Sequence, residues 1–230
     1  HQIAHMLCVA IDLGGSPEII QLAKTHKMIS ASVGVHPNTE LAKTLVINEI
    51  TAIANDEEVV AIGETGLDYF RSKGDLSWQR ERFRTHIQAA KELKKPLIIH
   101  SREAKEDVIQ ILKEEKAETV GGVMHCFVDD IETAKKAINM NFLISFSGIV
   151  TFKNAKPLQE VAKQIPLEHM LVETDAPYLA PTPFRGKTNQ PAYVKYVAEF
   201  ISELKDIPFD TVAEQTSLNY ENKFNKINKI

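Results

Sequence analysis

Short apolar segments alternate with longer amphipathic segments along the chain. The short segments are rich in Val, Ile, Leu and Phe, and several are apolar nearly throughout, which is typical of strands buried on both faces of a parallel sheet. The sequence therefore predicts strands over His5–Asp12, Ile29–Val35, Val59–Leu67, Leu97–His100, Gly121–Phe127, Phe142–Phe146 and Met170–Glu173.

The longer segments between these runs carry the period of a helix. Ser77–Lys94 places Phe83, Ile87 and Ala90 near helical spacing and ends in Lys-Lys-Pro, two cations and a proline that suit a helix end. The same pattern predicts helices over Pro17–His26, Glu103–Glu115, Asp130–Asn139, Ala155–Gln164, Pro191–Leu204 and Asp210–Phe224. Strands that alternate with helices indicate repeated βα units.

The predicted fold is an α/β barrel of the TIM type, with seven strands visible where such a barrel has eight. An open doubly wound sheet is the competing layout. It is disfavoured because no glycine-rich phosphate loop follows the first strand, where Gly14-Gly15-Ser16 suggests only a turn and a helix cap. With no repeat, linker or low-complexity stretch, residues 1–230 are expected to form one domain.

Composition narrows the class of protein. The chain is 43% hydrophobic and 25% charged, as in soluble globular proteins, and no apolar run is long enough to cross a bilayer. A net charge of −4 argues against a broad basic face for duplex DNA, so any nucleic-acid contact is expected to be local, as at a strand end. Cys8 and Cys126 lie in apolar runs and are expected to be free thiols, which points to the cytoplasm.

The strand ends carry the candidate chemistry. In βα barrels the reactive groups lie where strands run into the following loops, and there the chain places His36, Glu64, His100, His125 and Asp175. Ionisable side chains gathered at one rim are costly unless they share a partner, and a divalent metal is such a partner. We expect Glu64, His100, His125 and Asp175 to be the metal ligands, a donor set that suits Zn²⁺, Mn²⁺ or Fe²⁺. Taken singly, each residue also fits a helix cap or a solvated loop.

The segment after Asp175 indicates the kind of substrate. Prolines and Gly186 stiffen residues 176–191, and Arg185 and Lys187 place two cations within one loop's reach of the predicted metal. Paired cations suit an anionic substrate such as a phosphodiester, although a solvated loop with incidental charges gives the same pattern.

These residues resemble the TatD family of metal-dependent deoxyribonucleases. The match comprises Gly-Val-His-Pro at 34–37, Gly-Glu-Thr-Gly-Leu-Asp-Tyr at 63–69, Ile-Ile-His-Ser-Arg at 98–102, His-Cys-Phe at 125–127, Glu-Thr-Asp-Ala-Pro-Tyr-Leu at 173–179 and Arg-Gly-Lys-Thr-Asn at 185–189. The motifs follow the family's order over nearly the whole chain.

The resemblance implies a TIM-type barrel that hydrolyses DNA phosphodiesters, often as a 3′–5′ exonuclease, with two divalent cations (Mg²⁺, Mn²⁺ or Zn²⁺). Glu64 would bridge the two metals, His100 and His125 would complete one of them, and Asp175 would bind the other and help to activate water. Glu64 and Asp175 are thus the implied catalytic residues. The implied substrate contacts are His36, Arg102, Arg185 and Lys187. The expected partner is single-stranded DNA or a strand end, with no membrane and no obligatory protein partner.

One departure from the family concerns its first strand, which ends in a His-x-His pair that binds the metal shared by Glu64 and Asp175. This sequence has no such pair: His1 and His5 are four apart and are expected to be structural or exposed. We therefore expect the barrel domain to be N-terminally incomplete. Two alternatives stay open, namely an amidohydrolase-like enzyme that acts on another bond and an inactive truncated form.

Overall fold

The computed structural model describes residues 3–224, in which seven strands follow in the order β1-β2-β3-β4-β5-β6-β7. The strands β1 to β5 pair in parallel with their chain neighbours, and so do β6 and β7. Their bounds are β1 Met6–Cys8, β2 Ile29–Val33, β3 Val59–Asp68, β4 Leu97–Arg102, β5 Gly122–Met124, β6 Phe142–Phe146 and β7 Met170–Val172. Parallel strands in chain order, joined by helices, confirm the predicted βα fold class of the TIM type.

Eight α-helices connect or follow these strands within residues 3–224. They are α1 Ser16–Thr25, α2 Ile47–Ala54, α3 Ser77–Leu93, α4 Lys105–Glu114, α5 Ile131–Asn139, α6 Lys156–Gln164, α7 Val194–Lys205 and α8 Phe209–Phe224. The helix α2 was not predicted from the sequence. It is only eight residues long, follows Val46 rather than a Ser, Thr, Asp or Asn cap, and packs against α3.

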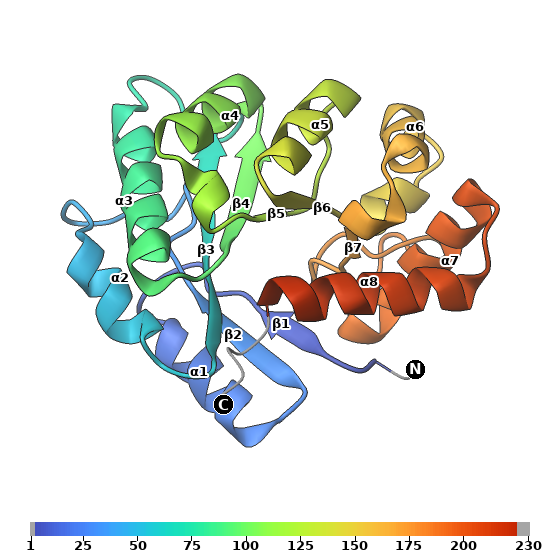
Figure 1. Cartoon of the computed structure of the whole chain (residues 1–230), viewed down its shortest axis with the longest axis horizontal. Helices are drawn as coiled ribbons and strands as arrows, with labels where there is room; N and C mark the ends of the chain where they lie inside the picture. The colour runs from blue at the N-terminus through green and yellow to red at the C-terminus, as the bar shows by residue number, and fades with distance from the viewer. Residues whose placement is uncertain (1–2, 225–230) are drawn as a thin grey trace. The chain divides into compact units, whose positions relative to one another are not determined.

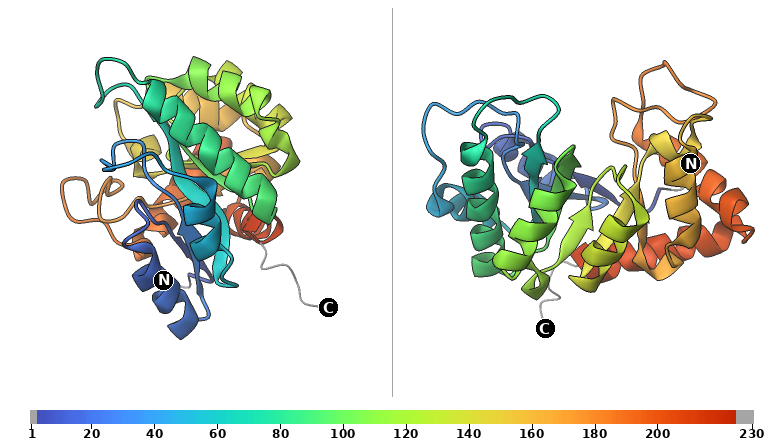
Figure 2. Two further views of the ribbon diagram at one scale, coloured as in Figure 1. Left: turned by 90° about the vertical axis from the view of Figure 1, so that its left-hand side faces the viewer. Right: turned by 90° about the horizontal axis from the view of Figure 1, so that it is seen from above.

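The chain divides into two compact units, which are described in turn. The N-terminal unit consists chiefly of His5–Met124 and holds β1 to β5 with α1 to α4. Its helices lie along the outer side of the strands (Figures 1 and 2). Its core is made of fully buried side chains that include Ile62, Leu67, Phe83, Ile87, Leu97, Ile98, Ile99 and Leu112.

Three strands of this unit are shorter than predicted: β1, β5, and β2, which ends at Val33 rather than at Val35. The ladder of β1 ends at Cys8, beyond which the Ala10 N–H donates to Ser32 Oγ and the Ala10 carbonyl accepts from the Glu64 N–H. The strand β5 ends at Met124, since Cys126 takes a positive φ of 45° that an extended strand excludes. Regular pairing thus stops where the chain turns toward the predicted site residues.

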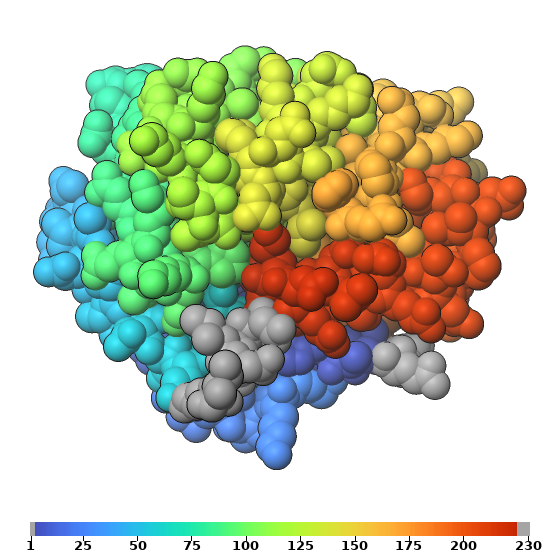
Figure 3. All heavy atoms as spheres, viewed as in Figure 1, coloured from blue at the N-terminus to red at the C-terminus, as the bar shows by residue number. Residues whose placement is uncertain are grey.

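The C-terminal unit consists chiefly of His125–Asn139 and Leu143–Lys223 and holds β7, most of β6, and α5 to most of α8. The helices α7 and α8 form much of its outer surface in the space-filling view, where they are orange to red (Figure 3). Asn219 of α8 is buried and donates through Nδ2 to the carbonyls of Leu167 and Met170, at 2.8 Å each. This amide fixes α8 to the start of β7.

Three further expectations concern the cysteines, membrane-spanning helices and the number of domains. Cys8 and Cys126 are free thiols, as predicted, and both are partly buried. Among residues 3–224, no helix combines the length and the apolar character needed to span a bilayer. The expectation of one domain over residues 1–230 stays a prediction.

Candidate metal centre

The adjacent strands β3 and β4 place three ionisable side chains together in the N-terminal unit. Gly66 of β3 is in register with His100 of β4, and Glu64 and Asp68 stand two residues to either side of Gly66. Gly66 has φ +138°, and a Cβ added there would lie 2.0 Å from the His100 carbonyl oxygen. Only glycine allows this close approach of the strands, so His100 comes to lie between the two carboxylates.

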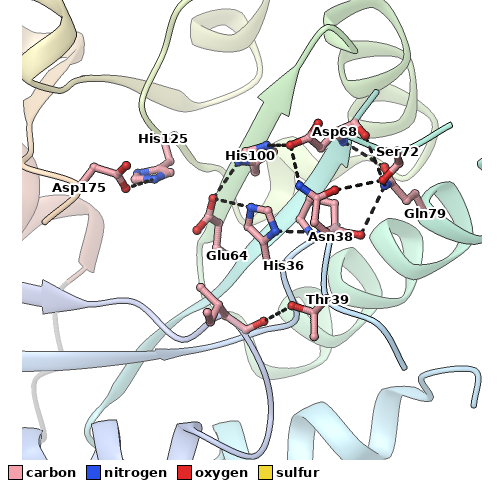
Figure 4. A network of polar contacts seen from close by, with 12 residues as sticks. His36, Asn38, Thr39, Glu64, Asp68, Ser72, Gln79, His100, His125 and Asp175 are labelled. Carbon is pink, nitrogen blue, oxygen red and sulfur yellow. Dashed lines mark hydrogen bonds and ion pairs between the residues drawn. The ribbon is translucent and has the colours of Figure 1, made fainter. Parts of the chain in front are cut away.

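The His100 ring contacts a carboxylate through each of its nitrogens (Figure 4). Nδ1 lies 2.9 Å from Glu64 Oε1, and Nε2 lies 3.2 Å from Asp68 Oδ2. Burial disfavours the charged ring, but the hydrogen bonds with Asp68 and Glu64 outweigh it and raise the pKa of His100. Glu64 is 8% exposed and Asp68 only 1%, so both carboxylates are largely withdrawn from solvent.

Asp68 is the most heavily hydrogen-bonded of these groups. Its Oδ2 accepts from Asn38 Nδ2 at 2.7 Å, and its Oδ1 accepts from the Arg71 N–H at 2.8 Å. Burial by itself raises the pKa of the carboxyl, but the hydrogen bonds from His100, the Arg71 N–H and Asn38 outweigh it and hold that pKa well below its usual range. Asp68 is therefore an ionised acceptor.

His36 lies beside Glu64 and His100 at the end of β2. Its Nε2 is 3.5 Å from Glu64 Oε1, and its ring meets that of His100 edge to face, with 4.5 Å between centroids. The Asn38 N–H donates to His36 Nδ1 at 3.1 Å, so the neutral ring carries its proton on Nε2. That nitrogen then faces the site as a donor, which suits the predicted role of His36 in substrate contact.

A second cluster lies in the C-terminal unit, where Glu173 and Asp175 follow β7 and His125 is their partner. His125 Nδ1 is 2.9 Å from Glu173 Oε2, and His125 Nε2 is 3.3 Å from Asp175 Oδ1 (Figure 4 draws the second contact). Asp175 has φ +59°, a conformation that Asp tolerates better than most residues.

Both clusters fit a divalent cation. In His36, Glu64 and His100, and again in His125, Glu173 and Asp175, one ligand atom per residue lies within 4.8 Å of the others. Glu173 Oε1 is buried and has no hydrogen-bond partner within residues 3–224, a costly state for a carboxylate unless a cation faces it. Imidazole with carboxylate is the donor set of Zn²⁺ and Mn²⁺ sites.

The loop after Asp175 is held by buried Asn189. Its Nδ2 donates to the carbonyls of Thr174 and Tyr178, at 2.7 and 2.6 Å, while the Tyr178 side chain stays 71% exposed. Further along the loop, the Arg185 guanidinium lies 4.3 Å from the Phe152 ring centroid, and Lys187 Nζ lies 5.8 Å from that of Phe184. Asn189 thus ties the loop to its own backbone, and aromatic rings contact its two cations.

Arg102, the last residue of β4, is held in the same way. Its guanidinium lies 4.0 Å from the ring centroid of Phe70, which is 51% exposed. Within residues 3–224, the side chains of Arg102, Arg185 and Lys187 form no ion pair and no hydrogen bond with the protein. Their N–H groups remain available to an anionic ligand.

The predicted ligands are thus brought together in two pairs, Glu64 with His100 and His125 with Asp175. It stays a prediction that Glu64 bridges two metals, one bound also by His100 and His125 and the other by Asp175. Sequence reasoning missed Asp68 and Glu173, each of which contacts a predicted histidine ligand. Their position gave a signal, because each stands two residues from another strand-end carboxylate or glycine, the spacing of residues that share a face.

Two other groups have no assigned part in this chemistry. His5 Nε2 is 2.9 Å from Ser30 Oγ, a structural contact as expected, whereas His1 lies outside the described residues. Burial raises the pKa of the Cys126 thiol to about 12, which leaves it protonated and unsuited to act as a nucleophile.

Comparison with known proteins shows the family. The sequence model of the TatD-related DNases matches residues 1–225. The chain is 46% identical to the uncharacterised metal-dependent hydrolase YabD of Bacillus subtilis, over 97% of this chain and 88% of YabD. It is 45% identical to the uncharacterised metal-dependent hydrolase YcfH of Escherichia coli, over 95% of this chain and 82% of YcfH.

Solved structures agree with this assignment. The TatD homologue YjjV of E. coli superposes with a TM-score of 0.88 at 26% identity, over 96% of this chain and 86% of YjjV. A TatD-family hydrolase of Entamoeba histolytica shares the fold, with a TM-score of 0.85 at 24% identity, over 97% of this chain and 85% of its own. As the sequence motifs predicted, the chain belongs to the TatD-related DNase family of metal-dependent hydrolases.

Proposed function

We propose that this chain carries the site of a deoxyribonuclease that removes nucleotides from the 3′ end of single-stranded DNA with two divalent cations. The observation that carries the proposal is the set of three uncommitted cations, Arg102, Arg185 and Lys187, each held over an aromatic ring. A phosphodiester has the negative charge that such groups recognise, whereas an amide or a lactone has none.

The metal ions would be held by Glu64 and His100 in one cluster and by His125 and Asp175 in the other. When bound, divalent cations supply an activated water and polarise the phosphoryl oxygens. Asp175 orients the attacking water and takes up its proton. Glu64 would hold the ion of the first cluster together with His100.

The remaining residues bind and orient the DNA end. His36 donates its Nε2–H to a phosphoryl oxygen, a role fixed by the Asn38 N–H on its other nitrogen. Arg102, Arg185 and Lys187 would each offset negative charge on the bound strand. The exposed Tyr178 ring offers a face on which an unpaired base can stack.

The test uses a single-stranded oligonucleotide labelled at its 5′ or 3′ end, with Mg²⁺ or Mn²⁺. We expect release of the 3′ label as a mononucleotide and stepwise shortening of the 5′-labelled strand. Glu64→Gln and Asp175→Asn should each lose at least 100-fold in rate, the loss typical of removing a group that acts in the transition state. Lys195→Ala, an exposed residue of α7 paired with Glu199, is the matched control.

Equal rates in wild type, Glu64→Gln and Asp175→Asn would contradict the proposal. Turnover of an amide or lactone panel without release of nucleotides would instead favour the amidohydrolase-like alternative, since both activities are compatible with this fold.

A further inference from the structure

We propose that Asp68 is a positioning residue that orients His100, so that Nε2–H points at Asp68 and Nδ1 is the atom presented to the metal. A neutral imidazole that ligates a metal through one nitrogen donates the N–H of the other, commonly to a carboxylate. Each nitrogen of the His100 ring contacts a carboxylate, so it must be decided which nitrogen faces the metal and which donates its N–H to a carboxylate.

The surroundings of each ring nitrogen answer it. On the Nδ1 side, Glu64 Oε1 at 2.9 Å is also approached by His36, and these three residues form the candidate metal cluster. On the Nε2 side stands Asp68, which is 1% exposed and not part of that cluster. Nδ1 therefore faces the cation site and Nε2 faces away from it.

Asp68 is held as an acceptor by a closed ring of hydrogen bonds whose directions follow one another (Figure 4). Gln79 Nε2 donates to Ser72 Oγ at 2.8 Å, and the Ser72 hydroxyl donates to Asn38 Oδ1 at 3.1 Å. Asn38 Nδ2 in turn donates to Asp68 Oδ2, and the Asp68 N–H returns to Gln79 Oε1 at 3.0 Å.

This cycle of hydrogen bonds determines which atom donates in the hydrogen bond between Asp68 and His100. Asn38 Nδ2 donates to Asp68 Oδ2 and the Arg71 N–H donates to Oδ1, so both carboxylate oxygens are acceptors, and Oδ2 is placed to accept from His100 Nε2 as well. Gln79 is itself fully buried, so the arrangement is anchored in the packing of α3 against β3. Metal binding then finds the imidazole already oriented, which lowers the conformational cost of ligation.

The inference rests on the metal site of the proposed function, and its test needs no DNA. In ¹⁵N-labelled protein loaded with Zn²⁺, long-range ¹H–¹⁵N correlation at pH 8 reports which nitrogen of each histidine is protonated. His100→Gln identifies the His100 signals. We expect a protonated Nε2 and a zinc-shifted Nδ1. A protonated Nδ1, or a ring untouched by zinc, would overturn the proposal.

Two substitutions separate positioning from folding. Asp68→Ala removes the acceptor, and we expect zinc affinity to fall 10- to 100-fold, the range found for partners of metal ligands. Asp68→Asn keeps an oxygen for His100 but loses the acceptor for the Arg71 N–H. Asp68→Asn should therefore lower the melting temperature of the zinc-free protein, while its affinity for zinc stays within a few-fold of the wild-type affinity.

The matched control is Asp75→Asn, which changes an exposed carboxylate in the segment between β3 and α3. It should leave zinc affinity unchanged. If Asp68→Ala loses stability but binds zinc as tightly as this control, Asp68 is structural only and the proposal is wrong. Because zinc affinity and the protonated nitrogen are read without hydrolysis, a failed nuclease assay would leave this result standing.

Discussion

Acidification should unfold this protein partly through one buried histidine, His86 of α3. The His86 ring is fully buried, its Nε2 accepts the Val35 N–H at 2.9 Å, and its Nδ1 donates to the Arg82 carbonyl at 2.8 Å. Burial disfavours the charged ring and lowers its pKa to about 4, from 6.5 when the ring is exposed. A proton on Nε2 would also remove the acceptor that holds Val35, the residue before His36.

The size and sign of the effect follow from these pKa values. Between pH 6.5 and pH 4, His86 is protonated in the unfolded chain but not in the folded chain. The free energy of unfolding therefore falls as the pH falls from 6.5 toward 4. The limiting loss is about 3 kcal/mol, from a difference of roughly 2.5 pH units at 1.36 kcal/mol each, and most of it is reached at pH 4.

The assay is urea unfolding at pH 7, 6, 5 and 4, with wild type compared with His86→Gln. Glutamine does not titrate and keeps an oxygen for the Val35 N–H, so other titrating groups cancel in the difference. We expect the stability difference between the two proteins to shrink by about 3 kcal/mol from pH 7 to pH 4. A difference that is constant with pH would refute the reasoning, and the exposed His26→Gln is the matched control.

Three further predictions concern the site. Tyr178→Ala should lower kcat/KM on a single-stranded oligonucleotide roughly 5- to 150-fold, because it removes about 1–3 kcal/mol of base stacking. On an oligonucleotide with abasic 3′ positions the substitution should cause no such loss, and an equal loss on both substrates would refute stacking. Phe70→Ala should raise KM several-fold by releasing Arg102, measured by initial rates, and should add nothing in an Arg102→Ala background. Gly66→Ala should lower the melting temperature and weaken zinc binding measured by calorimetry, because the added Cβ would clash with the His100 carbonyl oxygen. A melting temperature and a zinc affinity equal to those of wild type would contradict the strand geometry.

Much of the fold could be predicted because burial on both faces leaves a nearly unbroken apolar run, as in Phe142–Phe146, where predicted and observed bounds coincide. The helix α2 was missed because no Ser, Thr, Asp or Asn precedes its eight residues and because it packs against α3, a contact that no local pattern encodes. The ends of β1 and β5 were overextended for a related reason. Apolar character continues past the point where the hydrogen-bonded ladder stops, as Cys126 with its positive φ shows.

At the candidate site, too, some residues could be predicted from the sequence and others could not. Glu64, His100, His125 and Asp175 were predicted because strand ends meet at one rim of a βα fold. Asp68 and Glu173 were missed because their two-residue spacing predicts only a shared strand face and does not show that either carboxylate contacts a histidine. The orientation of His36 depends on a single backbone N–H of Asn38, which only three-dimensional structure can reveal.

The central claim is that the two clusters hold divalent cations. Its most direct test is an anomalous difference map from crystals of this chain grown with Zn²⁺ or Mn²⁺. The account predicts one peak about 2.0–2.2 Å from His100 Nδ1 and a carboxylate oxygen of Glu64, and another at the same range from His125 Nε2 and Asp175. Density at neither cluster, in crystals of protein that hydrolyses DNA with the same metal, would contradict it.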